Sequence, residues 1–103
     1  MEGKNTPGQN GKYSLGALRS YFLRGWYFYR IERVPHEVLT AKLLKAIDNT
    51  NMPFEVHQVI WTYKKQLQRH QISLEDFILS VIGYLNNLSE SSKYSKYFKK
   101  RIL

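Results

Sequence analysis

Apolar residues recur at steps of three and four along four stretches of this chain, and this spacing limits the fold more than any other feature. Such a period places the residues on one face of an α-helix, whereas a half-buried strand needs strict alternation. The pattern predicts helices over about residues 14–33, 35–48, 53–69 and 73–88. We expect an all-α fold, a compact orthogonal or up-and-down bundle of these four main helices plus a short basic C-terminal helix over residues 93–103.

Proline and serine residues mark where the predicted helices begin. Proline lacks a backbone N–H and disfavours helix in the residue before it, so Pro35 and Pro53 separate the first three helices. Ser73 begins a capping-box sequence, in which the hydroxyl accepts a hydrogen bond from the backbone N–H three residues on. Residues 26–34 also allow a strand, because aromatic residues favour strands. Helix is the preferred prediction there, since no partner strand follows.

Length and composition predict one small domain. The chain has 103 residues, of which 43% are hydrophobic, enough for a single core but short for the larger enzyme folds. Residues 1–12 are polar and rich in glycine, so we expect a disordered N-terminal tail followed by one helical domain over residues 13–103. The first residues hold no apolar signal segment, and no stretch approaches the ~18 apolar residues of a membrane span. We therefore expect a soluble, cytoplasmic protein with no membrane partner.

Positive charge is concentrated in two parts of the chain. Lysine and arginine number 16 against 8 acidic residues, which gives a net charge of +8. Residues 12–34 carry five cations against Glu32, and residues 90–103 carry five against Glu90, while the remaining segments are neutral. The C-terminal cations belong either to a solvated tail or to a surface for phosphate, an acidic protein or anionic lipid, with lipid ranked last. Phosphate contact is favoured if the fold brings both basic segments to one side.

The charge distribution predicts a non-catalytic protein that binds nucleic acid, DNA before RNA, as a regulatory or accessory factor. Lys64 and Lys65 lie on the polar side of the third predicted helix and would extend the basic surface. The predicted phosphate contacts are Arg19, Arg24, Arg30, Arg33, Lys64, Lys65, Lys93, Lys96, Lys99, Lys100 and Arg101.

Aromatic side chains interleave with the arginines of residues 13–33 and exceed what one helix contact can bury. They either pack on two sides of a central helix or remain exposed to stack on bases. Trp61 on the third helix is likewise either covered by a neighbouring element or a contact residue. The alternative function is therefore a protein-interaction module, such as an inhibitor, adaptor, immunity-type bundle or homodimer. The candidate interaction residues are Trp26, Tyr27, Phe28 and Trp61.

Residues for catalysis or metal binding do not form a recognisable pattern. The chain has no cysteine, so it offers no disulfide, thiolate zinc ligand or cysteine nucleophile. His36, His57 and His70 lie in separate segments without metal-ligand spacing, and the pair Glu75 and Asp76 is explained by its place at a helix start. Phosphate-binding loops and the nucleophile motif of hydrolases are absent from the sequence. We expect no enzymatic activity, no metal and no cofactor.

Overall fold

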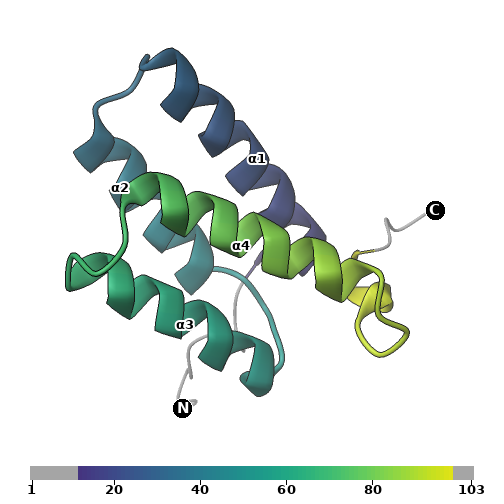
Figure 1. The fold of residues 1–103 in the computed structure, drawn as a ribbon. Coiled ribbons are helices and arrows are strands. Elements are labelled where there is room, and N and C mark those ends of the chain that lie inside the picture. Colours follow the sequence, from purple (N-terminus) through teal and green to yellow (C-terminus); the bar gives the residue numbers. More distant parts are fainter. Residues whose placement is uncertain (1–11, 99–103) are drawn as a thin grey trace, which may run out of the picture.

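The computed structural model describes residues 12–98, which form an all-α fold (Figure 1). This confirms the predicted fold class, and residues 26–34 lie in helix and turn rather than in a strand. The predicted disordered tail lies outside the described residues apart from Lys12. The elements are α1 (Leu15–Ile31), α2 (His36–Asp48), α3 (Phe54–Gln68), α4 (Leu74–Ser89) and the 3-10 helix η1 (Ser95–Phe98).

The helices begin where local chemistry predicts. Ser73 Oγ accepts a hydrogen bond from Asp76 N at 3.0 Å, so the predicted cap of α4 is confirmed. Ser14 caps α1 in the same way, with 3.1 Å between its Oγ and Ala17 N. Pro35 and Pro53 directly precede α2 and α3, where proline removes an N–H that a first turn does not use. These features fix the four helix starts independently of tertiary contacts.

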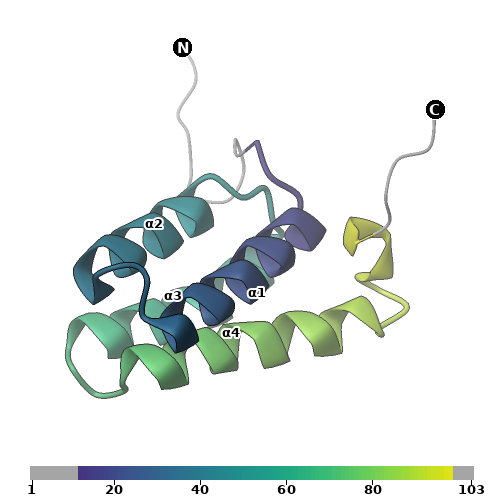
Figure 2. The same cartoon turned by 90° about the horizontal axis from the view of Figure 1, so that it is seen from above.

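Helix α1 is the central element of the bundle. Figure 2 shows it running between α2 and α4, and its most extensive packing is on α4. Phe22 of α1 lies fully buried against Phe77 of α4, with ring centroids 5.7 Å apart. Helix α3 packs mainly on α4, and in the view of Figure 1 it lies below α4 while α1 lies above it. None of the helices within residues 12–98 is long and apolar enough to cross a membrane.

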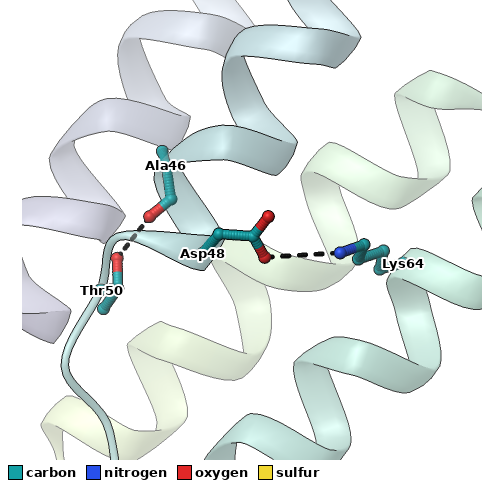
Figure 3. Close-up of polar contacts among 4 residues, drawn as sticks. All are labelled: Ala46, Asp48, Thr50 and Lys64. Carbon is teal, nitrogen blue, oxygen red and sulfur yellow. Dashed lines mark hydrogen bonds and ion pairs between the residues drawn. The ribbon is translucent and has the colours of Figure 1, made fainter. Parts of the chain in front are cut away.

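A short backbone contact ties the start of the domain to the connection between α2 and α3. Tyr13 N donates to Asn49 O at 2.9 Å, and Asn51 N donates to Tyr13 O at 2.8 Å, which makes an isolated parallel bridge. Thr50 is fully buried, and its hydroxyl donates to the Ala46 carbonyl at 2.7 Å (Figure 3). The hydroxyl is thereby satisfied without solvent.

The C-terminal segment is described in part. A short basic helix was predicted over residues 93–103, and the described residues of that range consist of turns and the 3-10 helix η1. Ser91 Oγ accepts from Lys93 N at 3.2 Å, a local bond that competes with helical hydrogen bonding. Tyr94, Tyr97 and Phe98 pack against the hydrophobic core. Residues 99–103 lie outside the described part of the chain.

Candidate nucleic-acid interface

The outer side of α1 exposes four large apolar side chains, and we call this surface the α1 face. It consists of Leu23, Tyr27, Phe28 and Ile31, whose exposed fractions range from 39% for Phe28 to 60% for Tyr27. Tyr27 and Phe28 contact each other edge to face, with ring centroids 5.6 Å apart. The predicted excess of aromatic surface on this helix is thus present for these two rings.

Trp26, the other predicted contact residue of this segment, is half-buried. Its ring stacks on Tyr29 with centroids 5.7 Å apart, and Tyr29 in turn stacks on His36 at 4.9 Å. Packing on two sides therefore accounts for part of the aromatic surface. Of the aromatic residues predicted for contact, Tyr27 and Phe28 remain the exposed ones on α1.

The arginines around the α1 face lie over rings instead of beside carboxylates. The guanidinium carbon of Arg24 lies 5.6 Å from the Tyr21 ring centroid, and that of Arg30 lies 5.9 Å from the Trp26 ring. Arg33 is exposed in the turn after α1. Within residues 12–98 none of these arginines makes an ion pair with a carboxylate. Their charge is available to an external anion, and the rings hold the guanidinium groups in place.

Arg19 lies where the two basic segments of the sequence meet. Its Nη1 donates to Asn86 Oδ1 at 3.3 Å, and its guanidinium carbon lies 5.0 Å from the Phe98 ring centroid. A Cβ added to Gly16 would lie only 3.3 Å from Phe98 Cα, so α1 and η1 approach closely here (Figure 2). The fold thus places Arg19 of the N-terminal basic segment beside Phe98 of the C-terminal one, while Lys93 of that second segment lies near Glu55 of α3.

The described C-terminal lysines differ in their partners. Lys93 Nζ lies 3.5 Å from Glu55 Oε2, and the Tyr94 hydroxyl donates to the same oxygen at 2.6 Å. The hydrogen bond from Tyr94, with the charge of Lys93 adding to it, lowers the pKa of Glu55. Lys96 is exposed, with its Nζ 5.5 Å from the Tyr97 ring centroid. The predicted contacts Lys99, Lys100 and Arg101 lie outside the described residues.

The cations of α3 form a separate surface. Lys64 has a side chain only 17% exposed, and its Nζ points to Asp48 Oδ1 at 3.4 Å across the gap to α2 (Figure 3). Lys65 Nζ lies 4.7 Å from the Trp61 ring centroid. Trp61 is 45% exposed and Phe54 63% exposed, so no described element covers them, although covering was the preferred prediction. Helix α3 makes few contacts with α1, so the structure does not join these residues to the α1 face.

The histidines occupy three unrelated environments. His36 stacks on Tyr29, and His70 follows the end of α3 with a positive φ of 60°. Burial lowers the pKa of His57 on α3, and the charge of Lys64 acts in the same direction. Within residues 12–98 no group of three or more histidine and acidic side chains is arranged to hold a metal ion.

Two residues near Arg24 were not among the predicted contacts. Tyr21 lies beneath the Arg24 guanidinium, and Lys42 of α2 lines the same hollow of the surface as Arg24. The helical period of α1 places Tyr21 and Arg24 one turn apart, so the contact between them could be predicted from the sequence. Nothing in the sequence linked Lys42 to α1, because only the packing of α2 on α1 brings them together.

Comparisons of the chain with protein-family models, with curated proteins and with solved structures found no match. The function is therefore argued from the residues of the site.

Proposed function

We propose that this protein binds nucleic acid as a non-catalytic accessory or regulatory factor, through the α1 face, its arginines and the adjoining C-terminal segment. The observation that carries the proposal is that Arg24, Arg30 and Arg33 make no ion pair among residues 12–98, while Tyr27 and Phe28 are exposed on the same helix as the first two. A basic surface attracts phosphate and releases counterions, which gives affinity that falls steeply with salt.

The mixture of groups on this surface also favours nucleic acid. Arginines without carboxylate partners are suited to phosphate oxygens, which accept their parallel N–H groups. Exposed Tyr27 and Phe28 lie among these arginines and offer flat faces to bases or sugars. A surface of cations alone would hold only the backbone, so the rings add a contact to the nucleoside itself.

A pair of matched double variants tests the proposal. Arg30→Ala with Arg33→Ala removes two charges beside the α1 face, and Lys65→Ala with Arg69→Ala removes two charges on and just after α3. We expect the first pair to flatten the slope of log affinity against log salt by about 0.7–0.9 for each phosphate that the variant no longer neutralises. The second pair should leave the slope unchanged. The measurement is fluorescence anisotropy with labelled single-stranded and duplex DNA and RNA at several salt concentrations.

Three outcomes of this titration would contradict the proposal. Equal weakening in both double variants would show attraction by net charge without a localised site. No binding at low salt would remove nucleic acid as a ligand despite the charge of +8. A defined dimer by light scattering, together with no salt-dependent binding, would favour the alternative of a protein-interaction module. The observation behind that alternative is the spacing of Leu23, Tyr27 and Ile31, which recur every fourth residue on the exposed side of α1.

A further inference from the structure

A hollow of about 210 Å³ lies between α1 and α2, beside the α1 face. Leu39, Val34 and Gly25 contribute apolar surface to it, and Leu39 and Gly25 are themselves buried. A Cβ at Gly25 would lie 3.0 Å from the Leu43 Cδ2 atom, so the two helices pack closely at this point. The volume is smaller than the ~300–1,000 Å³ of pockets for drug-sized ligands, so the hollow admits one ring system and not a whole cofactor.

Two aromatic rings and two cations complete this hollow. Phe28 and Tyr21 line it, and Phe28 is held by the edge-to-face contact with Tyr27. Arg24 and Lys42 line it from opposite helices, and Arg24 is held over the Tyr21 ring. Among the described residues no acidic side chain lines it, so its electrostatic potential favours an anion. Apolar surface, flat rings and two cations are what a nucleotide needs, with its base in the hollow and its phosphate at the cations.

We propose that the hollow between α1 and α2 holds one unpaired base of a single-stranded nucleic acid, with Phe28 stacking on the base and Arg24 and Lys42 binding the adjacent phosphates. This inference rests on the proposed function and narrows its ligand from nucleic acid in general to single strands. A duplex keeps its bases stacked and paired, so it cannot place one in the hollow without the cost of unstacking it.

A second hollow, of about 450 Å³, lies at the other flank of α1 and does not suit this ligand. Glu32 and Glu75 line it, and their carboxylates oppose phosphate. Its rings, Trp26, Tyr29 and His36, already stack on one another, which leaves less ring surface for a base. The two hollows therefore differ in charge and in free ring surface, and the one between α1 and α2 has both properties that a nucleotide requires.

The test compares a thymidine oligonucleotide with an abasic strand of the same length, which keeps the phosphates and lacks the bases. The full chain should bind the thymidine strand about 5- to 150-fold more tightly, the range expected for one stacked base. Phe28→Ala should abolish this preference. Phe54→Ala is the matched control, because Phe54 is an exposed phenylalanine on α3 that does not line the hollow, and it should retain the preference.

The outcomes separate this inference from the proposed function. Equal, salt-dependent binding of both strands by the wild-type chain would overturn the base pocket and leave nucleic-acid binding intact. No binding of either strand would overturn both. A preference that survives in folded Phe28→Ala, or that is absent from both variants, would also overturn the pocket.

A measurement on the wild-type chain guards against a variant that does not fold. Titration with thymidine monophosphate should shift the amide NMR signals of Gly25, Phe28 and Val34, which line the hollow, and leave those around Trp61 unmoved. Shifts confined to Trp61, or no shift at millimolar nucleotide, would overturn the proposed pocket.

Discussion

Helices α1 and α3 carry similar side chains and use them differently. Each presents a tryptophan, exposed apolar residues and several cations, and on each a cation lies over the tryptophan ring. Both ion pairs found among residues 12–98 involve α3, through Lys64 with Asp48 and Glu55 with Lys93. Within that range the arginines of α1 have no such partners. The two helices carry similar numbers of cations. Whether a given cation can bind an external anion therefore depends on the carboxylates near it.

The packing of the two helices differs as well. Helix α1 contacts α2, α4 and η1, while α3 packs mainly on α4. A helix held on three sides gives rigid support to the groups on its outer side, which a binding surface requires. The comparison therefore favours α1 as the proposed binding surface mainly for its position in the bundle, since Lys65 of α3 also lacks an ion pair among residues 12–98 and only Lys64 of α3 is paired.

The largest effect is expected from forcing α1 and α2 apart. Gly25→Val places a branched side chain where even a Cβ would lie 3.0 Å from the buried Leu43, so we expect a decrease of about 1–3 kcal/mol in the free energy of unfolding. Gly83→Val is the matched control, because nothing lies within 4 Å of a Cβ at Gly83. It should change stability by no more than about 0.5 kcal/mol. Urea denaturation measures both, and equal effects would show that α1 and α2 are not closely packed.

A smaller effect is expected where the two helices end. Glu32 after α1 and His70 after α3 both have positive φ, 53° and 60°, which costs a residue with a side chain more than it costs glycine. His70 N also donates to Leu67 O at 3.0 Å in this turn. Glu32→Gly and His70→Gly should each raise the free energy of unfolding by about 0.5–1 kcal/mol.

The same two variants also differ in their expected affinity for nucleic acid. Only Glu32→Gly removes a carboxylate from the hollow that Arg30 lines, so only this variant should strengthen nucleic-acid binding. Thermal denaturation and anisotropy give the two readouts. Destabilisation by either glycine would contradict the backbone argument, and equal gains in affinity would contradict the local role of Glu32.

The smallest effect is expected from removing the ion pair between Glu55 of α3 and Lys93. Glu55→Gln removes the carboxylate beside Lys93 and leaves an amide oxygen that can still accept from Tyr94. Affinity for single-stranded DNA should rise by up to about fivefold, because an exposed ion pair holds its partners only weakly. The slope of log affinity against log salt should steepen by about 0.7.

Glu37→Gln is the control for Glu55→Gln. It removes the same charge from an exposed glutamate that makes no ion pair within residues 12–98. Its affinity for single-stranded DNA should change by less than about twofold, because only the net charge of the protein differs. If both variants strengthen binding equally, the pairing of Lys93 has no influence on the interface.

The four helices and the concentration of charge follow from the amino-acid sequence alone. Helical period, proline placement and the Ser73 cap are set by neighbours along the chain, so they are readable without tertiary contacts. The same local rules predicted a short C-terminal helix but not the packing of Tyr97 and Phe98 of η1 against the core.

Which of these charges remain free of ion pairs depends on how the helices pack. Lys64 is bound by Asp48 and Lys93 by Glu55, whereas Arg24 and Arg30 lie over rings. The ion-pair partners are distant in the sequence, and the energy of an ion pair depends on the separation of its atoms in space. The hollow between α1 and α2 likewise depends on the tertiary structure. It exists only where Lys42 and Leu39 of α2 face Arg24 and Phe28 of α1.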